Sequence, residues 1–343
     1  MSAAFELRLG PSFGSEPVVS VDGAWDAPGL NLSHWPGNRT PAELKRPLST
    51  GIVLAFARLP AAERARRIGG ARLVVNNHYD TDGVLALFAF LRPDEALAHE
   101  RALLDAAAAG DFFEAPSDAA VALDALVAAF ADRARSPLAA RFVGLDAWAR
   151  WELAARELVE RLPALLGGEL ELHRELWQDA LSSLARGRAE LERATHDDLV
   201  HLDWSIWTAK DARAPFAPGR HALFGSTPRD RILTIAPRPK GTLYRFVIGT
   251  RSWFDGAEPA RLPRPDLAAL AARLNALEGV APAAALAWRA EDSSSPSPEL
   301  WFGAEGLDAF EEHNRCLAAS SLSPTVVRRE LAAALRGALV LPD

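Results

Sequence analysis

The sequence is poor in cysteine and has no long apolar run. Cys316 is the only cysteine among 343 residues, which excludes a disulfide framework within the chain and a zinc site built from several thiolates. No apolar stretch reaches the length of a membrane-spanning helix. Residues 1–10 carry charges where a signal peptide needs an apolar core. We therefore expect a cytoplasmic protein that does not associate with membranes.

Positive charge is also in deficit. The chain has 38 lysine and arginine residues against 45 aspartate and glutamate residues, and its net charge is -7 at pH 7. Binding to a nucleic-acid backbone relies on an excess of basic side chains, so this balance argues against a long nucleic acid as the partner. It favours a small molecule.

The length of the chain and its hydrophobic content of 49% allow one large domain or two ordinary ones. In residues 1–145, short apolar runs and helical segments predict an α/β domain with a largely parallel sheet. The mixed charges of residues 146–204 are typical of solvated helices and predict a helical insertion or connector. Residues 205–343 combine short β-like runs, prolines and a few amphipathic helices, which predicts a smaller α+β domain.

The most informative stretch is a strand, a polar turn and a helix in direct succession. The apolar run Leu73–Val75 predicts a buried strand, and a helical segment follows from Gly83. Between them, His78, Asp80 and Asp82 alternate along the chain, so in an extended segment their side chains share one face. One imidazole and two carboxylates at the carboxyl end of a strand suit a divalent cation such as Mn²⁺ or Mg²⁺.

The same residue types also shape turns and cap helices. Asn76, Asn77, Asp80 and Asp82 are all typical of such positions, and a carboxylate at a helix N-terminus is stabilised by the helix dipole. The stretch is then structural only. The strand before it and the helix after it provide the context of a metal site, so we favour that interpretation. Asn77 is then a candidate for contact with the substrate.

A further acidic residue follows the next strongly helical segment. Residues 102–109 are rich in alanine and predict a helix that ends at Gly110, in the position of a C-cap. Asp111 is expected just past this cap and is a candidate fourth metal ligand. The alternative for such a residue is a solvated position in a turn.

Residues 31–41 form a polar segment with two prolines, which excludes a regular helix or a central strand. Loops that carry His, Trp and Arg commonly serve function. We expect this loop to fold over the metal site, with His34, Asn38 and Arg39 as the residues that bind an anionic substrate. The alternative is a surface loop held in place by Trp35.

A second group of potential ligands lies between residues 195 and 204. His196 and His201 are five residues apart, whereas a helical site with two histidines needs a spacing of four. We therefore favour helix capping by Asp197 or Asp198 over a metal role.

The stretch His78–Gly83, between an apolar strand and a helix, resembles the first motif of the DHH phosphoesterases. Enzymes of this superfamily use two Mn²⁺ ions in a cleft between an α/β domain and a smaller substrate-binding domain. The resemblance implies that His78 and Asp80 bind one ion and that Asp82 binds the other. The segment around Asp111 is similar to a later family segment that supplies another metal-binding aspartate.

The rest of the chain is less similar to that superfamily. Residues 248–252 and the helix expected at 266–277 faintly resemble its C-terminal domain, which implies a role for Arg251 in binding phosphate. The Asp-His-His triple that names the superfamily is absent from the sequence. The loop at residues 34–38 also looks like a feature of an uncharacterised bacterial family, a resemblance that brings no activity with it.

These features predict a divalent-metal-dependent hydrolase of a small phosphodiester or phosphoanhydride. We expect one ion or two, because without the Asp-His-His triple a second ion has fewer ligands. The alternative is a non-catalytic ligand-binding or regulatory protein with a degenerate DHH-like cleft. Metal content and turnover of phosphodiester substrates distinguish these alternatives.

Overall fold

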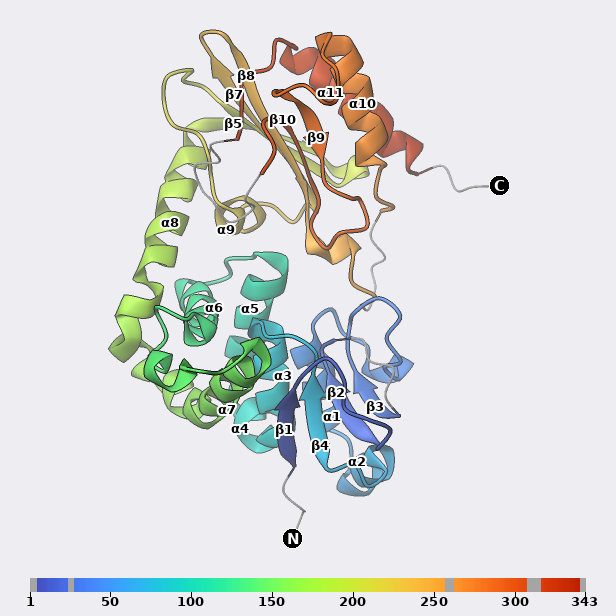
Figure 1. Ribbon diagram of the computed structural model, residues 1–343, viewed down its shortest axis with the longest axis vertical. Coiled ribbons are helices and arrows are strands. Elements are labelled where there is room, and N and C mark those ends of the chain that lie inside the picture. Colours follow the sequence, from blue (N-terminus) through green and yellow to red (C-terminus); the bar gives the residue numbers. More distant parts are fainter. Residues whose placement is uncertain (1–4, 24–27, 257–261, 307–315, 340–343) are drawn as a thin grey trace. The chain divides into compact units, whose positions relative to one another are not determined.

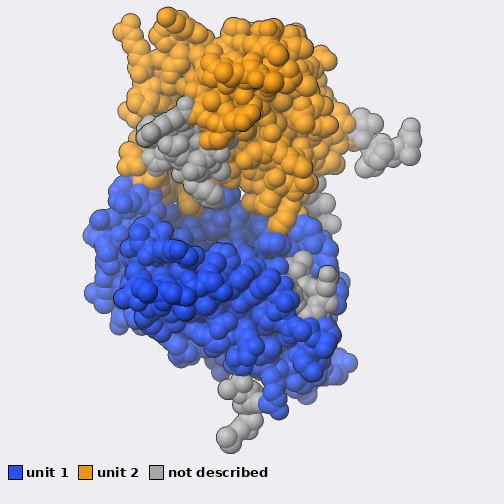
Figure 2. Space-filling view, in the orientation of Figure 1, with its two compact units in different colours: residues 1–182, 254–258 blue, residues 183–253, 259–343 orange. Residues whose placement is uncertain are grey.

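Two compact units make up the chain in the computed structural model (Figure 2). The structure describes residues 5–23, 28–256, 262–306 and 316–339. Unit 1 comprises residues 1–182 and 254–258, and unit 2 comprises residues 183–253 and 259–343. Each unit is described by itself.

Unit 1 is an α/β unit built on a parallel sheet (Figure 1). Its elements are β1 (Glu6–Leu9), β2 (Val18–Val21), β3 (Gly29–Leu32), α1 (Ser49–Ala57), α2 (Ala61–Ile68), β4 (Leu73–Asn76), α3 (Thr81–Leu91), α4 (Pro93–Ala98), α5 (Glu100–Phe112), α6 (Asp118–Ala131) and α7 (Ala147–Leu166), with short 3₁₀ helices at Ala42–Leu44, Ala139–Phe142 and Glu169–His173. The strands lie in the order β1-β4-β2-β3, and every neighbouring pair is parallel. The predicted α/β fold with a largely parallel sheet is confirmed.

Burial along the strands follows their place in the sheet. All four residues of β2 are buried, as expected for a strand covered on both faces. In β1, at the edge, Leu7 and Leu9 are buried, whereas Glu6 and Arg8 are exposed. The free side of β1 is covered by α7, because Glu152 accepts a hydrogen bond from Leu9 N (3.1 Å) and Arg156 donates one to the Leu7 carbonyl. These contacts occupy backbone groups that an edge strand otherwise leaves open.

The segment predicted as a separate connector, residues 146–204, is divided between the two units. Leu158, Leu162 and Leu165 of α7 lie in the core of unit 1. The charged residues that suggested a solvated helix occupy its other faces, as in any amphipathic helix. The boundary between the units falls inside the next helix, α8 (Arg174–Glu192), at residue 183.

Unit 2 is an α+β unit built on a six-stranded mixed sheet. Beyond the second half of α8, its elements are β5 (Ala194–Leu199), β6 (Trp204–Ala209), α9 (Arg220–Phe224), β7 (Arg231–Arg238), β8 (Gly241–Ile248), α10 (Leu267–Glu278), β9 (Ala287–Ala290), β10 (Glu299–Gly303) and α11 (Pro324–Gly337), with short 3₁₀ helices at Val200–Leu202 and Thr250–Ser252. The strand order is β5-β6-β7-β8-β10-β9. The apolar faces of α10 and α11 pack on this sheet in one core, which agrees with the α+β class predicted for this part of the chain.

The second ligand-rich segment of the sequence forms an edge strand, so the prediction that Asp197 or Asp198 caps a helix is wrong. In β5, Asp197 pairs with Arg328 (2.8 Å) and Asp198 pairs with Arg229 (3.1 Å). Strand pairing with β6 overrides the local preference of these residues for caps. Neither of the ligand groups found among the described residues includes them.

The longest described helices are α7 and α8, and both carry charged residues along their length. In the described parts of the chain, no helix combines the length and the apolar character that crossing a bilayer requires.

Candidate metal centre

Polar residues follow three neighbouring strands of the unit 1 sheet at their carboxyl ends. Asp22 comes directly after β2, His34 comes two residues after β3, and His78 comes two residues after β4. Because β4, β2 and β3 are adjacent and parallel, these three side chains meet at one edge of the sheet. Helix α3 starts at the same edge and brings Asp80 and Asp82 with it.

The first of two groups of candidate ligands consists of Asp22, His34, Asp82 and Asp111. All four are buried, and one ligand atom from each lies within 4.8 Å of those of the others. His34 Nε2 is 3.4 Å from Asp22 Oδ1, 3.7 Å from Asp82 Oδ2 and 3.2 Å from Asp111 Oδ2. Three carboxylates and one imidazole therefore converge on one point inside the unit.

The second group consists of Asp22, His78 and Asp80. His78 Nε2 is 2.7 Å from Asp22 Oδ2 and 2.9 Å from Asp80 Oδ2. Asp22 thus belongs to both groups, with one carboxylate oxygen toward each. Its backbone is left-handed (φ 63°), a conformation that aspartate adopts more readily than most residues and that is common at functional sites. The arrangement offers donors for two cations that share one carboxylate.

The His34 ring is fixed so that Nε2 faces the carboxylates. Nδ1 lies 2.6 Å from the Pro47 carbonyl, to which it donates, so Nε2 is the atom left to act as a ligand. Nε2 makes no hydrogen bond of ordinary geometry with any residue that the structure describes. Three carboxylates and one imidazole nitrogen that face one another are a donor set that fits a divalent metal in place of a proton.

The other face of the His34 ring is covered by a segment distant in sequence. Residues 254–256, here called the return segment, belong to unit 1, although residues 183–253 before them and the chain from residue 259 belong to unit 2. The Phe254 ring stacks on His34 with its centroid 3.7 Å away, and Asp255 N donates to the His34 carbonyl (2.7 Å). Asn38 Nδ2 donates to the Asp255 carbonyl (3.1 Å), and Lys45 Nζ lies 3.1 Å from Asp255 Oδ2. In this structure the Asn38 amide holds the return segment rather than an open substrate position.

Asp82 connects the centre to the start of α1. Its Oδ2 accepts a hydrogen bond from Ser49 N (2.6 Å) and its Oδ1 accepts one from Thr50 N (2.8 Å). Both donors are unsatisfied amides of a first helical turn, where a negative charge is favoured. Asp82 is thus both a candidate ligand and a cap for another helix. Its replacement is therefore expected to change the stability of the fold as well as metal binding.

Asp80 and Asn77 position the second group. Asp80 Oδ1 accepts from Gly83 N (2.8 Å) and caps α3, while its Oδ2 faces His78. Capping and metal binding are therefore compatible roles for one carboxylate. Asn77 Oδ1 is 2.8 Å from His78 Nδ1 and orients the imidazole, as outer-shell partners of metal ligands do. The Trp35 ring lies against His78 with its centroid 4.5 Å away.

Asp111 lies in the last turn of α5 rather than past its end, so the predicted C-cap at Gly110 is wrong. A Cβ on Gly110 would lie 2.8 Å from Thr81 Cβ and 3.0 Å from Asp124 Oδ1. The glycine therefore permits close packing of α5 on its neighbours. The helix ends instead at Phe112, and the C-cap residue Phe113 takes the left-handed conformation (φ 55°).

The sequence identified part of this centre. The structure brings His78, Asp80, Asp82 and Asp111 together, divided between two groups. Asp22 was missed, although it follows the apolar run of residues 18–21 in the same way that the recognised motif follows its own strand.

The residues expected to contact the substrate are more dispersed. His34 has no exposed surface and lies among the candidate ligands instead. Arg39 is exposed, and its backbone N–H donates to Asn31 Oδ1 (2.8 Å). Arg251 lies in unit 2, in the 3₁₀ helix Thr250–Ser252.

Burial and mutual charge set the protonation of the centre. Burial, helped by the charge of Asp22, raises the pKa of Asp82 to about 6. Burial and the charge of Asp82 raise the pKa of Asp111 well above its usual range. Burial acts to lower the pKa of His34 and His78, but the surrounding carboxylates hold both well above the ordinary value. Burial acts to raise the pKa of Asp22, and the two imidazoles instead hold it below its usual range.

We expect metal binding to release protons and to strengthen as the pH rises from 6 to 8. Without metal, the raised pKa values of His34 and His78 favour their protonated forms and Asp82 is partly protonated near pH 6, so protons compete with a cation. Raising the pH removes this competition. Titration calorimetry with Mn²⁺ at three pH values, in two buffers of different ionisation enthalpy, measures both effects. An affinity and a heat that change with neither pH nor buffer would contradict the expectation.

The fold and the site define an α/β protein with a buried histidine–carboxylate cluster at the carboxyl edge of a parallel sheet. The chain belongs to a family of unknown function, DUF6687, which it matches over residues 11–342. The match includes every candidate ligand and every described element except β1. A search of curated proteins gives no significant match.

Proposed function

We propose that this protein is a divalent-metal-dependent hydrolase of a small phosphodiester or phosphoanhydride. The observation that carries the proposal is the position of Asp22, whose carboxylate is shared by two groups of candidate ligands. Paired divalent ions are the usual means of displacing an oxygen at phosphorus, because they stabilise the attacking and the leaving oxygen together. The resemblance of His78–Gly83 to the first motif of the DHH phosphoesterases supports the same class.

Mn²⁺ is the ion that we propose for both positions, with Mg²⁺ as the alternative. Each group combines carboxylates with one imidazole. Mg²⁺ favours oxygen ligands and retains several waters, whereas first-row ions such as Mn²⁺ also accept imidazole nitrogen. The bound ions would supply Lewis-acid polarisation of the phosphoryl group.

The chain's own residues would hold and shape the site. One ion would be held by Asp22, His34, Asp82 and Asp111, and the other by Asp22, His78 and Asp80. The bonds of His34 to Pro47 and of His78 to Asn77 keep the ligating nitrogens directed inward. The rings of Trp35 and Phe254 cover the two imidazoles and restrict the access of water.

The acidic net charge supports a small substrate over a long nucleic acid. We propose Arg39 of unit 1 as a cation that binds its phosphate, because a guanidinium matches phosphate with two parallel hydrogen bonds. A chain with one cysteine suits the reducing cytoplasm, which we propose as its compartment.

Hydrolysis by metal-stripped protein with added Mn²⁺ tests the proposal. The substrates are bis(4-nitrophenyl) phosphate, pyrophosphate, a linear dinucleotide and a long oligonucleotide. We expect turnover of at least one small substrate, no turnover of the oligonucleotide, and complete inhibition by a chelator. Asp111→Asn is expected to lower the rate by about 100-fold or more, since even outer-shell changes cost about 10- to 100-fold.

Asp105→Asn is the matched control, because Asp105 lies on the same helix and pairs with Arg101 at the surface (2.9 Å). It is expected to keep full activity. Metal binding without turnover of any small substrate would favour the non-catalytic alternative. A protein that takes up no divalent metal would overturn the proposal.

A further inference from the structure

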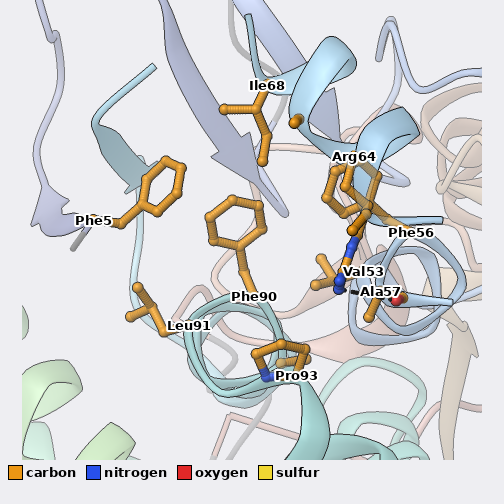
Figure 3. Close-up of a pocket in the computed structure, with 12 residues that line it drawn as sticks. Phe5, Val53, Phe56, Ala57, Arg64, Ile68, Phe90, Leu91 and Pro93 are labelled. Atoms are coloured by element: carbon orange, nitrogen blue, oxygen red, sulfur yellow. Dashed lines mark hydrogen bonds between the residues drawn. The ribbon is translucent and has the colours of Figure 1, made fainter. Parts of the chain in front are cut away.

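A large pocket lies in unit 1 between α1, α2 and the end of α3 (Figure 3). Its volume of about 610 Å³ lies within the range of small-molecule sites, which is about 300 to 1,000 Å³. It is formed by the second half of α1 and the last residues of α3, whereas the metal centre contacts the first turns of these two helices. None of the candidate metal ligands lines it.

The walls of the pocket are apolar and rich in aromatic rings. Phe90 lies between Phe5 and Phe56, with ring centroids 4.9 Å and 6.1 Å away. Phe5 and Phe90 are only partly buried, although both belong to the border of the core. Such partly exposed rings gain free energy when an apolar ligand covers them.

Arg64 is the single charged side chain among the twelve residues that line the pocket. Figure 3 shows it reaching from α2 toward α1, where its Nη1 donates to the Ala57 carbonyl (3.1 Å). No carboxylate of the described residues lies within ion-pair distance of it. The neighbouring Glu63 is turned away and pairs with Arg66 and Arg67.

A guanidinium has five donors, and Arg64 uses one of them for the Ala57 carbonyl. We propose that this pocket is a binding site for a small monoanion with an aromatic or other apolar body and one carboxylate. The carboxylate would accept hydrogen bonds from the remaining Arg64 donors, and the apolar body would lie against the phenylalanine rings. One unpaired positive charge matches one negative charge, which disfavours a polyphosphate. The proposal does not rest on the hydrolase function.

Binding of 1-naphthaleneacetate, measured by titration calorimetry on the full chain, tests the site. We expect one ligand per chain and a weakening of about tenfold or more in Arg64→Met, since a hydrogen bond to a charged group contributes about 1.5 to 3 kcal/mol. The neutral isostere 1-naphthaleneacetamide is expected to bind more weakly than the acid and to lose less affinity than the acid in Arg64→Met, because its oxygen accepts hydrogen bonds but carries no charge. Arg64→Lys keeps the charge and should lose less affinity for the acid than Arg64→Met.

Two further variants separate the pocket from the surface of α2. Arg66→Met removes an exposed arginine of the same helix and should leave binding unchanged. Ala65→Trp places a large ring on the pocket wall and should prevent binding of both compounds. Failure of wild type to bind the acid, or equal affinities of Arg64→Met and Arg66→Met, would overturn the proposal and leave Arg64 as a cap of α1 only.

Discussion

Asp22→Asn is expected to abolish binding at both metal positions at once. The substitution keeps the shape of the side chain, and asparagine tolerates the left-handed backbone of this position as well as aspartate does. It removes the negative charge that both groups share, with Oδ1 toward His34 and Oδ2 toward His78. Titration calorimetry with Mn²⁺ should show a loss of about 100-fold or more at each position, since changes outside the ligand shell already cost up to about 100-fold.

Three other variants show whether this loss comes from one shared carboxylate. Asp111→Asn and Asp80→Asn each alter one group, so each should weaken one of two binding events and spare the other. Asp105→Asn, at the surface of α5, should change neither. If Asp22→Asn keeps one ion at the wild-type affinity, the two groups do not share a carboxylate in solution.

Gly83→Ala should lower stability by about 1 kcal/mol, although alanine is the better helix former. The gain in helix propensity is about 0.5 to 1 kcal/mol, whereas overpacking a filled site costs about 1 to 3 kcal/mol. A Cβ at this position would lie 2.3 Å from Asn76 Nδ2, 2.9 Å from Asp22 Oδ2 and 3.0 Å from Asp80 Oδ1. All three neighbours must shift, so Mn²⁺ affinity should fall as well, by about tenfold.

Urea denaturation of the metal-free proteins measures this destabilisation. Gly337→Ala, at the end of α11, is the matched control, because nothing lies within 4 Å of a Cβ built there. It should be neutral or slightly stabilising. A Gly83→Ala protein that is as stable as Gly337→Ala, with unchanged metal affinity, would contradict the prediction. It would show that the start of α3 accommodates a Cβ at this position.

Local patterns in the sequence were enough to identify one strand end of the centre. His78, Asp80 and Asp82 can be recognised as candidate ligands from the sequence, because the strand before them and the helix after them lie in the same short stretch. The alternation between apolar runs and helices likewise predicted the parallel sheet of unit 1. These are short-range features, which a single sequence displays directly.

The parts of the centre that were not predicted from the sequence depend on contacts between distant residues. Asp22 becomes a candidate ligand only when β2 pairs with β4, for example at Val19 and Val74. His34 is buried by Phe254, 220 positions further along the chain by residue number. Gly110 looked like a cap because the packing of α5 against Thr81 is not visible in the local pattern.

The return segment, residues 254–256, makes unit 1 discontinuous along the gene. A fragment that ends at residue 182 lacks the Phe254 ring that covers His34 and the Asp255 amide that bonds to it. The candidate metal centre therefore cannot be transplanted as one uninterrupted module, and a recombination event that exchanged all residues after 182 would remove part of its wall. The centre then depends on residues on both sides of residues 183–253, which accords with a family that extends over residues 11–342.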